Sequence, residues 1–130
     1  MRIVTSIGGR WKGCEDSKIL FAIHKERARK LFSSLPRLYG VRPPDELTLR
    51  PFYFKGQESR INGRALYING RGYFILLSVP DCMAMPDKGL WVMDHEVAHI
   101  IAWRMGDNSR MRHRPIFEDV YRSAREVPIS

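Results

Sequence analysis

The feature that most constrains this chain is a long apolar segment in its C-terminal half. Apolar residues dominate the sequence from about Lys88 to Met105 and leave no continuous polar face. A helix that is apolar nearly all round is normally packed on every side, as the central helix of a domain is. Asp87 is suited to cap the start of such a helix, and Gly106 is suited to end it. The segment therefore predicts a buried central helix around which the rest of the chain must be arranged.

Inside this helix the sequence reads His95-Glu96-Val97-Ala98-His99. Helical residues four apart lie on the same face, so the imidazoles of His95 and His99 can bind one metal ion without distorting the backbone. Glu96 lies about 100° further round the helix, where its carboxylate can act on a water molecule at the ion. The pattern predicts zinc-dependent hydrolysis of a peptide bond with Glu96 as the general base. The alternative is a pair of core histidines whose hydrogen bonds are satisfied within the protein.

A catalytic zinc ion usually takes three ligands from the protein, so one more is needed. His113 is the favoured residue, because the chain between His99 and His113 is long enough to finish one helix and turn back toward it. Glu118 is the alternative, since a glutamate on a second helix can also fill this role. The longer motif, with glycine and histidine three and six positions after the second histidine, is absent because Ala102 and Met105 stand there.

Three aspartates near the motif are candidates to support the ligating imidazoles. A histidine bound to a metal normally donates its other ring N–H to a carboxylate or a carbonyl. Asp94, Asp107 and Asp119 are near enough in the sequence for this role. The alternative for each is an ordinary helix cap or a surface acid.

Hydrophobic periodicity predicts two further helices. Apolar residues at three- and four-residue steps indicate a helix over 17–35, with Asp16 or Ser17 at its start and Pro36 at its end. A last helix is expected to begin near Pro115, since proline is suited to a first helical position.

Three strands are expected between the first helix and the apolar helix. They lie at 47–54, 63–70 and 73–79. The predicted order is then one helix, three strands and two helices. This order indicates a single α+β domain over residues 1–130 with a three-stranded sheet.

The charge of the chain is strongly positive and unevenly distributed. The formal net charge is +8, and residues 1–44 hold ten bases and three acids, a net of +7. Sixteen of the 22 bases are arginine, whose planar guanidinium binds phosphate with two hydrogen bonds. Arg27, Arg29 and Lys30 are expected on this basic face. The pattern favours a polyanionic partner such as DNA, and the alternative is a solvated helix face.

The remaining composition excludes several classes of protein. The two cysteines, Cys14 and Cys82, supply neither a zinc ribbon nor a disulfide scaffold. No stretch is apolar for the roughly 18 residues that a membrane span needs, and the first ten residues are too polar for a secretory signal. A cytoplasmic protein without a membrane partner is expected.

Two groups of residues carry a resemblance to a known family. The motif at 95–99 followed by His113-Arg114-Pro115-Ile116-Phe117 resembles the SprT-like zinc metalloprotease family, and 63–67 and 75–78 are similar to its strand pair before the active-site helix. The similarity covers roughly residues 18–125, and only the histidine motifs are specific.

This resemblance implies a zincin-like α-β-β-β-α-α core. It also implies zinc ligands His95, His99 and His113, with Glu96 as general base. Arg114 stands where the family usually has glycine, and no four-cysteine ribbon follows the core, so one DNA-contacting module of the family is missing.

Three functions are compatible with these observations. The first is a zinc endopeptidase that binds an extended peptide beside an exposed strand and acts on proteins associated with nucleic acid. The second is a nucleic-acid-binding module in which zinc is purely structural. The third is a non-catalytic assembly protein that retains a peptidase fold and its zinc site.

Overall fold

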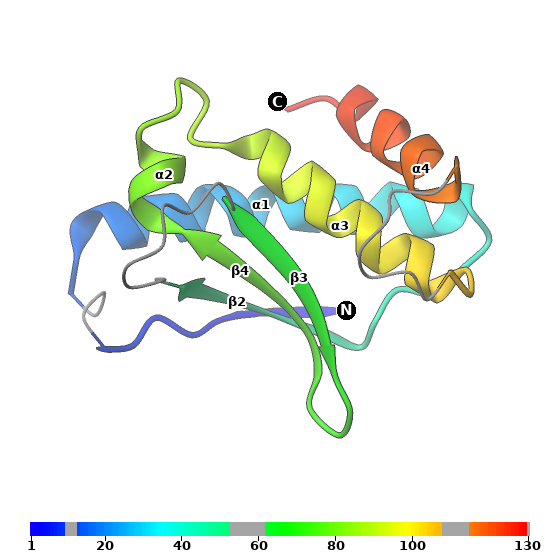
Figure 1. The fold of residues 1–130 in the computed structure, drawn as a ribbon, viewed down its shortest axis with the longest axis horizontal. Helices are drawn as coiled ribbons and strands as arrows, with labels where there is room; N and C mark the ends of the chain where they lie inside the picture. The colour runs from blue at the N-terminus through cyan, green and yellow to red at the C-terminus, as the bar shows by residue number, and fades with distance from the viewer. Residues whose placement is uncertain (10–12, 53–61, 108–114, 130) are drawn as a thin grey trace.

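A computed structural model describes residues 1–9, 13–52, 62–107 and 115–129 of the chain. Four helices and four strands lie within these residues (Figure 1). Their order is β1 (Arg2–Thr5), α1 (Glu15–Leu38), β2 (Glu46–Phe52), β3 (Gly63–Ile68), β4 (Gly72–Ser78), α2 (Val79–Met83), α3 (Leu90–Arg104) and α4 (Pro115–Glu126). The α+β class expected from the sequence is confirmed.

The sheet has four strands in the order β1-β2-β4-β3, so the expectation of three strands is wrong. β1 pairs with β2 in parallel, with Arg2 opposite Glu46, and β2 pairs with β4 in parallel. β3 and β4 form an antiparallel hairpin, and β3 is one edge of the sheet. β1 was missed because its four residues show no clear alternation and its partner lies beyond the whole of α1.

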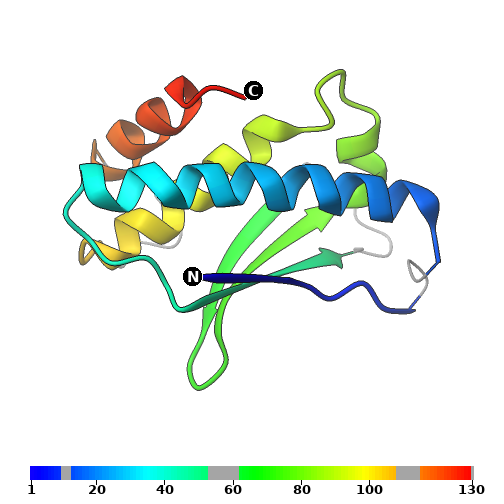
Figure 2. The same ribbon diagram turned by 180° about the vertical axis from the view of Figure 1, so that it is seen from behind.

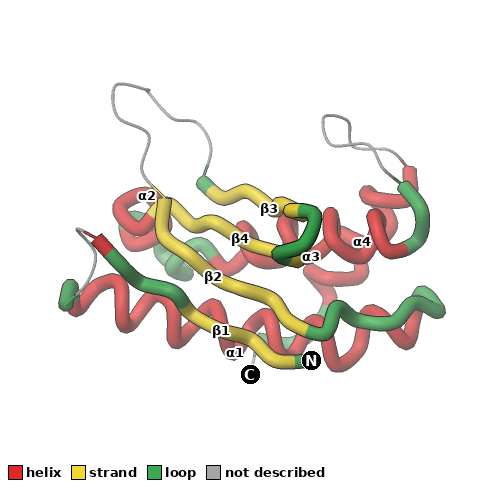
Figure 3. The backbone as a smooth tube through the Cα atoms, turned by 90° about the horizontal axis from the view of Figure 1, so that it is seen from below, coloured by secondary structure: helices red, strands yellow, loops and turns green. Residues whose placement is uncertain are grey.

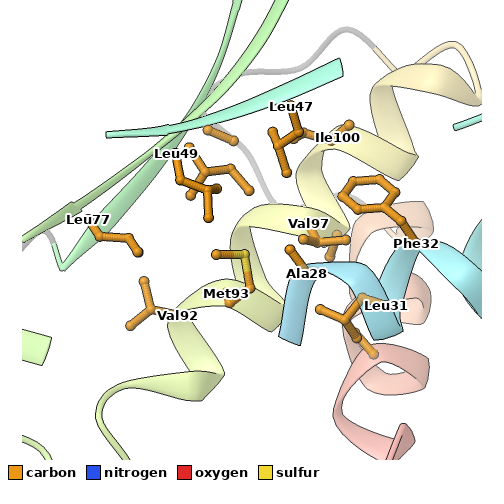
Figure 4. Packing of buried hydrophobic residues seen from close by; sticks show 14 of the residues in the cluster. Ala28, Leu31, Phe32, Leu47, Leu49, Leu77, Val92, Met93, Val97 and Ile100 are labelled. Carbon is orange, nitrogen blue, oxygen red and sulfur yellow. The ribbon is translucent and has the colours of Figure 1, made fainter. Parts of the chain in front are cut away.

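The helices form one layer and the sheet forms the other (Figures 1 and 3). α1 runs along the length of the molecule in the helical layer (Figure 2). Alternate residues of the two inner strands face this layer, and Leu47, Leu49, Ile75 and Leu77 are each fully buried. They pack against Ala28 and Phe32 of α1 and Met93, Val97 and Ile100 of α3 (Figure 4). Burial of these side chains is the main force that holds the layers together.

The bounds of α1 differ from the prediction at both ends. The helix starts at Glu15, so Asp16 and Ser17 lie inside it and do not cap it. Pro36 also lies inside the helix, in its last turn, where proline removes only one backbone hydrogen bond. The helix ends at Leu38, and Gly40 takes the left-handed conformation at φ 66° that commonly follows a helix.

α3 is the central helix that the apolar segment predicts. Ten of its 15 residues are buried, and it contacts β3, α1 and α4. Asp87 accepts a hydrogen bond from Gly89 N–H at 3.0 Å, so it stabilises the turn before the helix. Gly106 at φ 96° follows the helix end as expected. Among the described residues, no helix is both long and apolar enough to cross a membrane.

Candidate metal centre

Three side chains of α3 converge on the side of the helix that faces β3 and α4. His95, Glu96 and His99 each offer a ligand atom, and these atoms lie within 4.8 Å of one another. Glu96 and His99 are buried, whereas the side chain of His95 is 22% exposed. The cluster is therefore enclosed on most sides and open at His95, as a site that binds a small reactant needs to be.

The carboxylate of Glu96 is held in place by two donors. Oε1 accepts a hydrogen bond from the backbone N–H of Ala65 on β3 at 2.9 Å. Oε2 lies 2.6 Å from Nδ1 of His95, whose ring N–H donates to it. One oxygen is thus fixed to the edge strand and the other faces the imidazoles.

A glycine allows β3 to approach α3 this closely. A Cβ on Gly63 would lie 2.4 Å from Cγ1 of Val92, 3.2 Å from the carbonyl oxygen of Leu76 and 3.5 Å from Cγ of Glu96. Real Cβ atoms do not approach neighbours at the first of these distances, so any larger residue forces β3 or Val92 to move. Gly63 therefore belongs to the structure that positions Glu96.

Aromatic rings from α4 and α3 surround the two imidazoles. Phe117 stacks on His99 with ring centroids 4.2 Å apart, and it meets His95 edge-on at 5.1 Å. Tyr121 lies 5.4 Å from the ring of His95. Trp103 stacks on the ring of His99, with ring centroids 5.9 Å apart. These contacts restrict the rotation of both imidazoles and shield them from water.

Of the two candidates for a third ligand, the structure describes Glu118. His113 lies outside the described residues. Glu118 is exposed on the first turn of α4, and among the described residues it is not part of the group whose ligand atoms converge. The helix that carries Glu118 nevertheless rests on the imidazoles through Phe117.

Two of the three candidate aspartates bind groups other than the imidazoles. Asp94 accepts a hydrogen bond from Nε of Arg27 at 2.7 Å, and both side chains are buried. Burial raises the pKa of Asp94, although the guanidinium opposes this shift. Asp119 accepts a hydrogen bond from the hydroxyl of Tyr39 at 2.7 Å. Asp107 follows the end of α3, and its backbone N–H donates to the carbonyl of Ala102.

The expected basic face on α1 is smaller than the sequence indicates. Arg27 is only 3% exposed, so its expected place on the surface is wrong. Arg29 is exposed but forms an ion pair with Glu26. Lys30 donates from Nζ to the carbonyl of Ile129 at 2.6 Å. The apolar periodicity of α1 does not predict that Arg27 points inward, because a basic residue with a long side chain is normally assigned to the surface from the sequence.

Sequence reasoning also missed the groups that position the motif. Ala65 acts through its backbone N–H, which every residue except proline carries, so no sequence signal marks it. For Phe117 the sequence indicates a place in the family motif and on the apolar face of the last helix, but not its contact with the histidine rings.

The donor set of the cluster fits a divalent cation. Two imidazoles beside a carboxylate are typical of zinc and related metals, and the group could hold such an ion. Comparisons of the chain with protein families, with curated proteins and with solved structures find no match. The chemistry of these side chains is therefore the basis for any assignment of function.

Proposed function

We propose that this protein is a zinc-dependent endopeptidase of the SprT-like type, with a zincin-like fold. The observation that carries the proposal is the convergence of His95, Glu96 and His99 within 4.8 Å on a helix beside an edge strand. A buried carboxylate with one buried and one half-buried imidazole on the same helix is costly to retain as a set of simple core residues. A bound cation compensates this cost.

His95 and His99 would hold the zinc ion, and His113 is the favoured third ligand. α4 begins at Pro115, two residues after His113, and its Phe117 touches both imidazoles. The chain thus reaches the cluster shortly after this histidine. Glu118 remains the alternative, because it follows Phe117 directly on α4.

Glu96 has the position of a general base. A bound zinc ion would polarise the peptide carbonyl and make the attacking water more acidic. Glu96 accepts the proton of that water at a carboxylate oxygen and later delivers it to the leaving amine. The N–H of Ala65 holds the carboxylate in one orientation throughout, so little reorganisation is needed at the moment of reaction.

The edge strand β3 offers a binding surface for the substrate. Among the described strands, β3 pairs with β4 alone, and its N-terminal half runs beside α3. An extended peptide can add to such an edge through backbone hydrogen bonds, which suits a peptidase that accepts many sequences. This placement brings a backbone carbonyl of the peptide close to Glu96.

The decisive experiment measures zinc content and proteolysis on the same preparations. Purified protein should hold one zinc ion per chain and cleave unfolded casein. Glu96→Gln should keep the zinc but lose cleavage by about 10²-fold or more, since general-base catalysis typically contributes 10²–10⁴. The matched control is Glu126→Gln, an exposed acid at the end of α4, which should behave as the parent.

The proposal fails if Glu96→Gln cleaves casein as fast as the parent protein. His95→Ala and His99→Ala should each lose the metal, and comparison of His113→Ala with Glu118→Ala identifies the third ligand by which of them lowers zinc content. Cleavage that persists without zinc would also contradict the mechanism.

The second candidate is a nucleic-acid-binding module with a structural zinc ion. The net charge of +7 over residues 1–44 favours it, although Arg27 is buried and cannot contact a ligand. Binding to DNA that weakens steeply with salt, together with no hydrolysis of casein, would support this function. If DNA instead stimulates cleavage by the parent, charge reversal at Arg29 and Lys30 should reduce that stimulation.

A further inference from the structure

One face of the sheet lies on the side away from the helices. The four described helices lie together behind the strands (Figure 3). Leu47, Leu49, Ile75 and Leu77 face these helices, so the residues between them point to the opposite side of the sheet. We call this opposite side the outer face, and it comprises Arg2 and Val4 of β1, every second residue of β2 from Glu46 to Phe52, Arg64, Leu66 and Ile68 of β3, and Phe74 and Leu76 of β4.

The outer face has an apolar centre. Phe74 and Leu76 of β4 and Leu66 of β3 are half-buried, and Ile68 is 39% exposed. Strand pairing places Leu66 directly opposite Phe74. These side chains form a continuous apolar strip along β4, which lies between β2 and β3.

Two arginines lie on either side of this strip. Arg50 of β2 and Arg64 of β3 are both in register with Leu76, one on each neighbouring strand. Adjacent strands are about 4.8 Å apart, so the two Cα atoms are roughly 10 Å apart across the sheet. Both arginines are exposed, and within the described residues neither forms an ion pair.

Within the residues that the structure describes, no layer covers the outer face. β1, β2 and β4 are parallel to one another, and parallel strands almost always carry a layer on both of their faces. A strip of half-exposed phenylalanine and leucine at the centre of such a sheet is typical of a surface that is covered in use. The covering layer must match both the apolar strip and the two arginines.

The charge of the outer face indicates which class of partner can bind there. Glu46 is the single acid on the outer face, and it is already paired with Arg2 at 2.7 Å. A second copy of this chain would bring another arginine-bearing face and a further net charge of +8 to the same place, which opposes association. A complementary partner needs carboxylates on both sides of an apolar stripe.

We propose that the outer face binds an acidic amphipathic helix of a partner protein, laid along β4. An α-helix with its side chains is about 10 Å wide, which matches the separation of Arg50 and Arg64. The apolar stripe of the helix covers Phe74 and Leu76, and carboxylates on its two flanks pair with the two arginines. This surface is distinct from the cluster of His95, Glu96 and His99, which lies on the helical side of the sheet.

The test uses two synthetic helical peptides with leucine at i, i+3, i+4 and i+7, one with glutamate on both flanks and one with lysine. Fluorescence anisotropy measures the dissociation constant of each. The parent should bind the glutamate peptide about tenfold tighter than the lysine peptide, and Arg50→Glu/Arg64→Glu should invert this order. Glu96→Gln, which should not cleave the peptides, should give the same dissociation constants as the parent, so the measured affinity does not depend on turnover.

The control variant is Lys25→Glu/Arg37→Glu, which makes the same change in net charge at two exposed positions of α1. It should keep the preference of the parent, and circular dichroism should show that both double variants are folded. The inference is overturned if the parent does not prefer the glutamate peptide, or if the preference survives the reversal of Arg50 and Arg64. It is equally overturned if oligo(dT) binds the parent more tightly than the glutamate peptide does and loses that affinity in Arg50→Glu/Arg64→Glu but not in Lys25→Glu/Arg37→Glu, because the face would then be a nucleic-acid site.

Discussion

Two polar clusters lie on α3, and they are formed by neighbouring residues. Asp94 points toward α1, where it binds Arg27, and we call this pair the arginine cluster. His95, Glu96 and His99 point toward β3 and α4, and we call them the imidazole cluster. The two clusters share a helix and a high degree of burial, so burial alone does not separate a structural group from a candidate site.

The clusters differ in how donors and acceptors are matched. Arg27 has no acceptor of its own and meets only acceptors: Asp94 and the carbonyl oxygens of Ala124, Val127 and Pro128, all at 2.7–3.0 Å. In the imidazole cluster, Glu96 also accepts from Ala65 and His95, but each of the three side chains still offers a ligand atom, and these atoms converge within 4.8 Å. Complementary partners make a cluster that stabilises the fold by itself. Converging lone pairs are the arrangement that a cation requires.

The largest effect is expected from Arg27→Met. This change leaves the carboxylate of Asp94 buried without its partner and removes the donors from the carbonyl groups at the end of α4. Loss of one partner of a buried ion pair costs about 3–5 kcal/mol. Chemical denaturation should show this decrease in the free energy of unfolding.

Arg29→Met is the matched control for this prediction. Arg29 is two residues away on α1 but exposed and paired only with the exposed Glu26, so its loss should cost less than about 0.5 kcal/mol. Addition of Asp94→Asn to Arg27→Met should recover part of the lost stability, because it removes the uncompensated charge. If Arg27→Met and Arg29→Met lower the free energy of unfolding equally, the arginine cluster does not stabilise the fold.

An intermediate effect is expected from Gly63→Ala, which tests the imidazole cluster. The added methyl would lie 2.4 Å from Val92 and 3.5 Å from Glu96. Overpacking of this kind costs about 1–3 kcal/mol. Relief of this contact by a shift of β3 away from α3 should lengthen the hydrogen bond from Ala65 to Glu96, and cleavage of casein should then fall more than zinc content does.

Val92→Ala in the Gly63→Ala background is the compensating change. It removes the methyl groups that the new side chain meets, so stability and cleavage should both move back toward the parent. If Gly63→Ala alone leaves stability and cleavage unchanged, the close approach of β3 to α3 does not position Glu96.

The sequence predicted those parts of the fold that depend on local patterns. α3 and α4 were expected because their apolar periodicity, and for α4 the initial Pro115, are properties of single segments. β1 was not expected, since four residues carry little periodic signal and their pairing partner lies far along the chain. Tertiary pairing decides the strand there, and local propensity does not.

The candidate site shows the same division. The helical spacing of His95 and His99 is enough to predict that they converge, since residues four apart share a face. The partners that fix Glu96 come from β3, through a backbone N–H and through a glycine whose importance lies in the absent side chain. Neither contact can be read from a sequence, because each depends on how closely two distant elements approach.

The smallest effect concerns His24, a buried histidine outside the imidazole cluster, which we place with the structural groups. His24 lies on α1 and is fully buried, and its Nε2–H donates to the carbonyl of Lys88 at 2.8 Å in the turn before α3. Burial lowers the pKa of His24 from the ordinary value of 6.5, although the hydrogen bond to Lys88 and the charge of Asp87 oppose the shift. Its Nδ1 has no hydrogen-bond partner within the described residues, so a second ring proton would be buried without an acceptor.

The sign of the pH dependence follows from this lowered pKa. Below about pH 6.5 the unfolded chain protonates His24 while the folded protein does not, so the free energy of unfolding falls by up to about 1.4 kcal/mol per pH unit until the folded pKa is reached. Above neutral pH His24 is neutral in both states, so it contributes nothing to the pH dependence of the free energy of unfolding.

His24→Gln keeps a donor for the Lys88 carbonyl but does not titrate. Urea denaturation near pH 7.5 and near pH 5.5 should therefore show a smaller loss of stability for this variant than for the parent. All other ionisable groups are present in both proteins, so their contributions cancel in the difference. Equal losses would mean that His24 is protonated as readily in the folded protein as in the unfolded chain, and the contrast between a buried structural histidine and the imidazole cluster would then not hold.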